Sequence, residues 1–124
     1  KQIVFLNFDQ NMAVTKEIIK ACNKECQIHA FELENTFLPY LEKLHAPNLH
    51  IIPDDVRNAS LYVPEGSVDI IFSCLPFGSF DNELVHEILS EAKKMLRPGG
   101  KFVQFQYFLS DKKKIACHFE VCNI

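Results

Sequence analysis

Short runs of apolar residues recur along the chain and predict buried strands. The four clearest runs are IVFL at 3–6, QIHAF at 27–31, NLHII at 48–52 and VDIIF at 68–72. Apolar runs of this length suit parallel strands that are covered on both faces. A fifth strand is expected at 101–108, where KFVQFQYF alternates apolar and polar residues, and a sixth candidate is KIACHFEVCNI at 114–124.

Segments with helical spacing of apolar residues separate these runs, and they predict helices at 12–22, 35–45 and 81–96. The last helix is the clearest. One face collects Leu84, Val85, Ile88, Leu89, Ala92, Met95 and Leu96. Asp81 can cap its amino end, and the turn RPGG at 97–100 places a proline and two glycines where the helix should end.

The order of these elements predicts the class of fold. Strand and helix alternate up to the third strand, a long loop follows, and the chain then continues as strand, helix and strand. This alternation predicts one α/β domain over residues 1–124, with a mostly parallel sheet and helices on both faces. In such a sheet, ligands bind beyond the carboxyl ends of the strands.

Composition and charge narrow the classes of function. Hydrophobic residues make up 48% of the 124 residues and the formal net charge is −3, which argues against a domain that mainly binds a phosphate backbone. No run approaches the roughly 18 apolar residues of a membrane span. The five cysteines form no CxxC pair, so we expect reduced thiols, no metal site and a cytoplasmic protein.

Polar residues and one apolar corner follow the strands at their carboxyl ends. Glu32 follows the second strand, the pair at 54–55 is DD after the third, and SCLPF at 73–77 follows the fourth. Each acid by itself could be a helix cap or a solvated loop residue. Together they favour a binding site, because an acid after the second strand of a doubly wound fold can accept hydrogen bonds from both ribose hydroxyls.

The segment at 66–107, GSVDIIFSCLPFGSFDNELVHEILSEAKKMLRPGGKFVQFQY, carries a family resemblance. It resembles the class I S-adenosylmethionine-dependent methyltransferases from their fourth strand to their fifth. Within that class it is similar to the phospholipid N-methyltransferases and the ribosomal RNA adenine dimethylases, through the LPF corner and FVQFQY at 102–107. The resemblance implies a Rossmann-like doubly wound sheet that lacks the usual final strand pair, in a domain shorter than the family at both ends.

The resemblance also assigns roles to single residues. It implies that Glu32 binds the ribose of S-adenosylmethionine, with Leu33 beside the adenine. It implies that Asp55 contacts the adenine amino group and that Val56 packs on the ring. Ser73 belongs to the cofactor side of the corner that faces the transferred methyl group. The substrate-positioning residues of that corner are Cys74, Leu75, Pro76 and Phe77, and the Phe77 ring could cap a cationic centre.

The loop after the first strand departs from the family. Family members carry a glycine-rich stretch there, whereas this chain has NFDQN and no glycine before Gly66. The corresponding cofactor-binding candidates are Asn7, Phe8, Asp9 and Asn11. Asparagine and aspartate tolerate a left-handed backbone better than most residues, so they can substitute for glycine in the turn.

Three functions remain open at this point. The first is methylation of an amine on a small molecule or a lipid headgroup, with possible contact to a membrane surface. The second is a non-catalytic binding or scaffold domain of the same fold, which the glycine-free loop favours. The third is an RNA adenine methyltransferase, and Cys74 argues against it because adenine-modifying relatives carry an asparagine there, whose oxygen is a better acceptor than a thiol. Nucleic acid is therefore not an expected partner.

Overall fold

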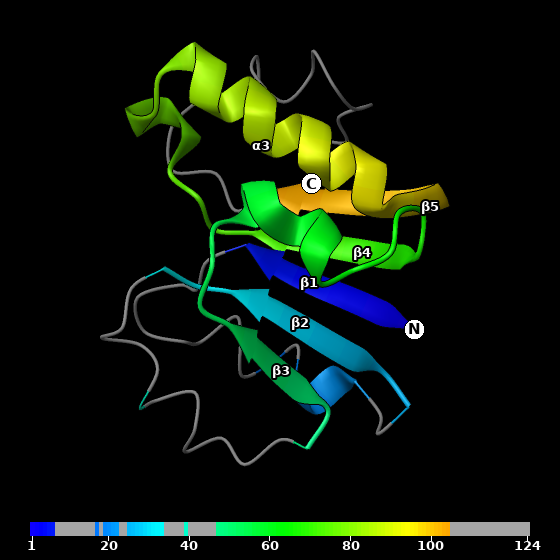
Figure 1. The fold of residues 1–124 in the computed structure, drawn as a ribbon. Helices are drawn as coiled ribbons and strands as arrows, with labels where there is room; N and C mark the ends of the chain where they lie inside the picture. The colour runs from blue at the N-terminus through cyan, green and yellow to red at the C-terminus, as the bar shows by residue number, and fades with distance from the viewer. Residues whose placement is uncertain (7–16, 18, 23–24, 34–38, 40–46, 105–124) are drawn as a thin grey trace.

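The computed structural model describes residues 1–6, 17, 19–22, 25–33, 39 and 47–104 (Figure 1). The strands are β1 Gln2–Leu6, β2 Gln27–Phe31, β3 Leu49–Ile52, β4 Val68–Ser73 and β5 Leu96–Gln104. The described helices are the 3₁₀ helices η2 Val56–Leu61 and η3 Phe77–Ser79 and the α-helix α3 Asn82–Met95. The first four strands lie within one residue of the positions that the apolar runs predict.

The five described strands are all parallel and form one sheet in the order β3-β2-β1-β4-β5. The chain therefore moves outward in one direction from β1 to β3, and then returns to the other side of β1 for β4 and β5. This reversal is the switch point of a doubly wound sheet, next to which ligands bind in such folds. The structure confirms the predicted Rossmann-like α/β class.

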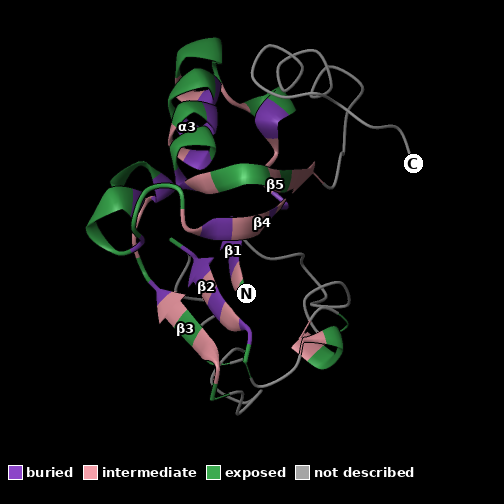
Figure 2. Ribbon diagram, turned by 90° about the vertical axis from the view of Figure 1, so that its right-hand side faces the viewer, coloured by how far each residue is buried: buried purple, intermediate pink, exposed green. Residues whose placement is uncertain are grey.

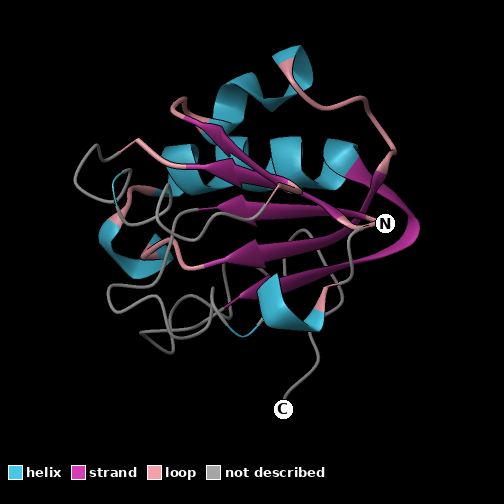
Figure 3. Ribbon diagram, turned by 90° about the horizontal axis from the view of Figure 1, so that it is seen from below, coloured by secondary structure: helices cyan, strands magenta, loops and turns pink. Residues whose placement is uncertain are grey.

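Two apolar clusters cover the two faces of the sheet. On one face, α3 and η2 pack against residues such as Val4, Leu6 and Ile71. On the other face, Ile3, Phe5 and Ile28 form a second cluster, and Ile19 of the described helical residues 19–21 packs against it. Figure 3 shows α3 and η2 on one side of the sheet and the short helical segment on the other. The prediction of helical cover on both faces is thus confirmed within the described chain.

Helix α3 follows its predicted pattern closely. Its buried residues are Val85, Ile88, Leu89, Ala92 and Met95, and they face the sheet while the opposite side of the helix is exposed (Figure 2). The Asp81 carboxylate accepts a hydrogen bond of 2.8 Å from the Leu84 backbone N–H and so caps the helix, as the sequence predicts. Apolar burial on one side fixes the position of α3 over the sheet.

Strand β5 begins earlier than predicted. The turn at 97–100 was expected to lie between helix and strand, but the pairing with β4 starts at Leu96, and the turn forms a bulge between the Val68 and Ile70 positions of β4. Gly99 has a φ of +82°, and a Cβ on Gly100 would come within 3.0 Å of the Val68 carbonyl oxygen. The two glycines therefore allow the bulge and the close approach of β5 to β4 at this point.

A ladder of polar side chains crosses the sheet nearer the amino ends of the strands. Asp69 on β4 binds Arg97 and accepts a hydrogen bond of 2.8 Å from the Gln2 backbone N–H. His29 Nε2 lies 2.7 Å from Gln2 Oε1, and the His29 ring stacks on His50 of β3. These partners give His29 a structural role in the sheet.

Several predicted elements fall outside the described residues. They are most of the helix at 12–22, the helix at 35–45 apart from Pro39, and the strand at 114–124. The expected lack of a final strand pair concerns residues after 104 and is likewise outside the described chain. Among the helices that the structure does describe, none is both long and apolar enough to cross a membrane.

The Asp81 cap gives a direct test of why α3 starts where it does. We expect Asp81→Ala to lower the free energy of unfolding by about 1 kcal/mol, because it leaves the Leu84 N–H without its side-chain acceptor. Asp81→Asn keeps an acceptor oxygen and should stay close to the parent chain in a urea titration. Equal losses in both variants would contradict the capping role.

Candidate cofactor cleft at the carboxyl ends of the strands

A cleft of about 330 Å³ opens where β1, β2 and β4 end. Its floor includes Leu6 and Phe31, the last residues of β1 and β2. The remaining lining residues come from the loops after β2, β3 and β4, from η2 and from α3, namely Glu32, Leu33, Asp54, Asp55, Val56, Arg57, Leu75, Pro76, Phe80, Leu84 and Ile88. The cleft therefore lies at the switch point, where the sequence places its candidate ligand-binding residues.

Glu32 lines this cleft and directly follows β2. Its backbone N–H donates a hydrogen bond of 3.1 Å to the Ile52 carbonyl oxygen, which continues the β2–β3 pairing one residue past the end of β2. The residue is only 3% exposed, although it carries an ionisable carboxyl group. A carboxyl group that is buried to this extent is uncommon in proteins.

Leu33 and Val56, the residues that follow Glu32 and Asp55 in the chain, provide apolar surface in the same cleft. Val56 is buried at the start of η2, whereas Leu33 is 65% exposed, an unusual value for a leucine that lines a cleft. A flat ring that entered the cleft would cover part of this exposed side chain. Both residues line the cleft, and their contact with an adenine stays a prediction.

The corner after β4 is held to the sheet by several backbone contacts. The Cys74 N–H donates to the Leu6 carbonyl oxygen at 3.0 Å, which extends the β1–β4 pairing one residue past the end of β4. The Leu75 carbonyl oxygen accepts from the Phe77 N–H at 2.9 Å and from Gln104 Nε2 at 2.9 Å. Since these two donors occupy both lone pairs of the Leu75 carbonyl oxygen, this group is part of the corner's own framework.

Only part of the predicted corner faces the cleft. Leu75 and Pro76 line it, but Ser73, Cys74 and Phe77 are buried and do not. The structure corrects the role expected for the Phe77 ring, which is fully buried in the core cluster under α3 because the turn η3 directs it inward. Phe80, whose ring packs edge-on against Phe77 at 6.4 Å between centroids, lines the cleft instead.

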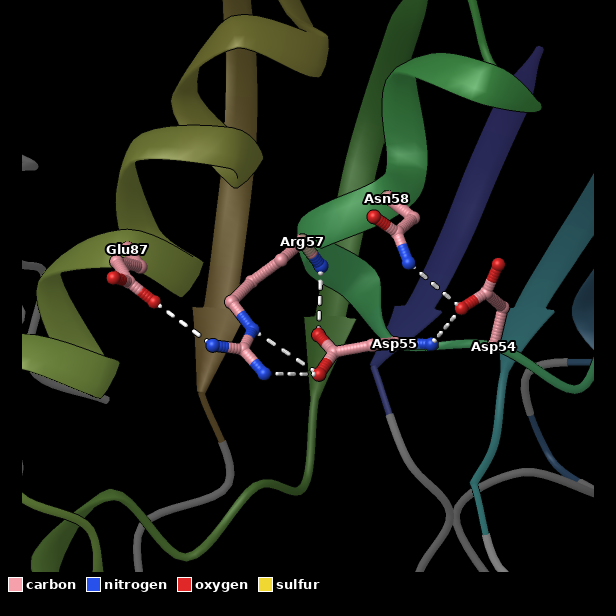
Figure 4. Close-up of polar contacts among 5 residues, drawn as sticks. All are labelled: Asp54, Asp55, Arg57, Asn58 and Glu87. Atoms are coloured by element: carbon pink, nitrogen blue, oxygen red, sulfur yellow. Dashed lines mark hydrogen bonds and ion pairs between the residues drawn. The ribbon is translucent and has the colours of Figure 1, made fainter.

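Asp55 is engaged by Arg57 at the start of η2. Its Oδ1 accepts from the Arg57 backbone N–H at 2.8 Å, and its Oδ2 accepts from Arg57 Nε at 3.1 Å and Nη2 at 2.8 Å (Figure 4). The Arg57 Nη1 then donates to Glu87 Oε2 of α3 at 3.0 Å. One guanidinium thereby links the loop after β3 to the helix that covers the sheet.

Asp54 has a separate set of donors. Its Oδ1 accepts from the Asp55 backbone N–H at 2.7 Å and from Asn58 Nδ2 at 3.0 Å (Figure 4). Its Oδ2 accepts from the Tyr62 hydroxyl at 2.7 Å. The two adjacent acids therefore have different partners, because Asp54 joins the loop to η2 through Asn58 and Asp55 binds Arg57.

These contacts shift the ionisation of both acids in one direction. The side-chain hydrogen bond from Arg57 is the main cause that lowers the pKa of Asp55, and the hydroxyl of Tyr62 is the main cause that lowers the pKa of Asp54. The same hydrogen bond raises the pKa of Tyr62. Both carboxyl groups are therefore ionised at neutral pH and act only as hydrogen-bond acceptors.

The sequence prediction brings together some of its residues and misses others. Glu32, Leu33, Asp55, Val56, Leu75 and Pro76 all line one cleft. Asn7, Phe8, Asp9 and Asn11 lie outside the described residues. Arg57 and Glu87 were not predicted, although an arginine two residues after a capping aspartate is a usable signal for a local ion pair. Within the described residues, no group of three or more side chains could hold a metal ion.

Comparison with known proteins identifies the family. A family model described as a methyltransferase domain matches residues 13–100. The chain belongs to the methyltransferase domain family. The match covers the strands β2, β3 and β4, the cleft residues that follow them and the whole of α3. No curated protein sequence matches the chain significantly.

Solved structures agree with this methyltransferase domain in fold. An rRNA methylase from Streptococcus thermophilus is 20% identical with a TM-score of 0.64, over 90% of this chain and 63% of that one. A SAM-dependent methyltransferase from Aquifex aeolicus is 17% identical with a TM-score of 0.59, over 78% and 51%. Phosphoethanolamine N-methyltransferase 1 from Haemonchus contortus, in complex with phosphoethanolamine and S-adenosylhomocysteine, is 20% identical with a TM-score of 0.64, over 81% and 21%.

Two of these names state different substrates, rRNA and phosphoethanolamine, so the shared fold does not select a substrate for this methyltransferase domain. The chain spans less than two thirds of the length of each of them.

The contact between Tyr62 and Asp54 can be tested by ultraviolet titration of tyrosine ionisation. We expect Asp54→Asn to lower the pKa of Tyr62 toward the ordinary value of about 10, because the variant removes the negative charge that disfavours the phenolate. The chain has three tyrosines, and Tyr62→Phe assigns the relevant step. An unchanged Tyr62 titration in the Asp54→Asn variant would show that the two side chains do not interact in solution.

Proposed function

We propose that this chain binds S-adenosylmethionine and transfers its methyl group to an amine of a small molecule or a lipid headgroup. The family match supports methyl transfer and its cofactor, and the observation that carries the proposal is the buried carboxyl group of Glu32 inside a cleft at the switch point. The cofactor expected from the sequence thus has a family and a cleft that fit it.

The cleft residues fit the separate parts of the cofactor by their chemistry. Glu32 would accept hydrogen bonds from the two ribose hydroxyls, which suits a carboxylate at the end of β2. Asp55, ionised and at the cleft wall, would accept a hydrogen bond from the adenine amino group. Leu33 and Val56 would cover the faces of the ring with apolar surface.

Methyl transfer from this cofactor mainly requires the protein to position the two reactants. When bound, the cofactor supplies a methyl group that is already activated on a sulfonium, so the reaction needs no metal and no nucleophilic side chain. Leu75, Pro76 and Phe80 form an apolar wall of the cleft that would exclude water and orient the acceptor amine. The backbone contacts of the corner keep this wall in place.

A second candidate is a non-catalytic domain of the same fold. The observation that favours it is the sequence NFDQN after β1, where the resemblance would require glycines that let the backbone approach the cofactor. An RNA adenine methyltransferase is a weaker candidate: an rRNA methylase shares the fold, but Cys74 stands where adenine-modifying relatives carry an asparagine.

Calorimetric titration with S-adenosylmethionine and with S-adenosylhomocysteine separates these candidates. We expect binding to the parent chain, and we expect Glu32→Gln to weaken it by about 1.5–3 kcal/mol, the scale of a hydrogen bond to a charged group. Glu65→Gln is the matched control, because Glu65 is an exposed glutamate just before β4, at the opposite end of the sheet.

The outcomes distinguish the candidates. No heat of binding at millimolar cofactor would reject the enzyme proposal in favour of a non-catalytic domain. Binding that is equally strong in the Glu32→Gln variant would mean that the ribose lies elsewhere. If the cofactor binds, methyl transfer to ethanolamine-headgroup vesicles, to free amines and to RNA would then test the substrate class.

A further inference from the structure

Arg57 is the one described cation on the cleft lining, and it contacts two acids from distant parts of the chain. Figure 4 shows its side chain extending from η2, between Asp55 and Glu87. The guanidinium presents Nε and Nη2 to one oxygen of Asp55 and Nη1 to Glu87. Because Glu87 belongs to α3, whose apolar face is buried against the sheet, the far end of Arg57 has a fixed anchor.

This arrangement restricts the carboxyl group of Asp55. A lone aspartate at a helix cap can rotate about its terminal torsion, but here the backbone N–H of Arg57 holds Oδ1 while the guanidinium holds Oδ2. Because Oδ1 is held by the backbone N–H and Oδ2 by two guanidinium N–H groups, the carboxylate cannot rotate without losing at least one of these hydrogen bonds. The direction of the unused lone pair of Asp55 is therefore set by Arg57.

The hydrogen bonds from Arg57 also leave a limited number of acceptor positions on the Asp55 carboxylate. An ionised carboxylate has about four acceptor positions, and Arg57 occupies three of those on Asp55. The remaining position on Oδ1 can accept one further N–H. A group with only acceptor capacity favours an amino group over a hydrogen or a carbonyl oxygen at the same place.

We propose that Arg57 is a positioning residue for cofactor selection, which orients Asp55 so that the cleft prefers a purine with a 6-amino group. The inference rests on the proposed function, since it requires that the adenine amino group binds Asp55. Glu87 supports the same preference from α3 by holding Arg57 in place. Arg57 itself touches the acid and not the reacting atoms, so it acts on recognition and not on the methyl transfer.

The test compares two ligands rather than one. Affinities are measured by calorimetry for S-adenosylhomocysteine and for its analogue with unsubstituted purine in place of adenine. For the parent 124-residue chain we expect a preference for adenine of about tenfold or more, the worth of one hydrogen bond to a charged acceptor. In Arg57→Ala the preference should fall to about threefold or less, because the carboxylate keeps only the backbone N–H at Oδ1 and loses both guanidinium donors at Oδ2.

Two further variants complete the design. Arg57→Lys keeps the positive charge but cannot bind Asp55 through a planar fork, so its preference should fall between those of the parent chain and Arg57→Ala. Glu91→Gln is the charge control. It removes one negative charge from α3, the helix that carries Glu87, but Glu91 pairs with Lys94 and not with Arg57. Its preference should equal that of the parent chain. Exposed ion pairs contribute little to stability, so all variants should stay folded.

Four results of these measurements would contradict the proposals. Equal weakening of both ligands in Arg57→Ala would overturn the inference, because it would indicate a general loss of structure in the cleft. A lower adenine preference in Glu91→Gln would also overturn it, since the effect would then come from overall charge. A parent chain that binds both ligands equally would refute the inference while leaving cofactor binding intact. A parent chain that binds neither ligand would refute the proposed function itself.

Discussion

The central position of β1 is the constraint on which the rest of the structure depends. It pairs in parallel with β2 on one side and with β4 on the other, and residues Ile3 to Leu6 are buried. Parallel pairing on both sides directs every carboxyl end to one edge of the sheet. It also forces the chain to leave β1 in one direction and to return on the other side, so the loops after the strands part at this edge. The cleft is the space that this parting creates.

Hydrogen bonds that extend the sheet past its strands give the cleft its fixed walls. One joins Cys74 to Leu6, and another joins Glu32 to Ile52. In the loop after β3, Asp54 accepts a hydrogen bond from the Asp55 backbone N–H, and Asp55 accepts hydrogen bonds from Arg57. The acid that would recognise an adenine is thus already oriented before any ligand enters. Preorganised groups of this kind lower the cost of binding, because less conformational freedom is lost.

The sequence predicts those features that depend on local pattern. The first four strands are correct because burial on both faces requires continuous apolar runs, and α3 is correct because its apolar stripe and its Asp81 cap are both local. The start of β5 is wrong because the bulge depends on close contact between Gly100 and Val68, which are far apart in the chain. The inward Phe77 ring and the pairing of Arg57 with Glu87, 30 residues away, likewise follow from packing that no local pattern encodes.

The central claim is that the edge of the sheet around the carboxyl end of β1 is the binding site. Amide chemical-shift mapping by NMR during titration with S-adenosylhomocysteine tests it directly. The account predicts the largest shifts at Glu32, Leu33, Asp55, Val56 and Leu75, and little change around His29 and His50 in the polar ladder. Largest shifts in the ladder, or no shifts at saturating ligand, would contradict the account.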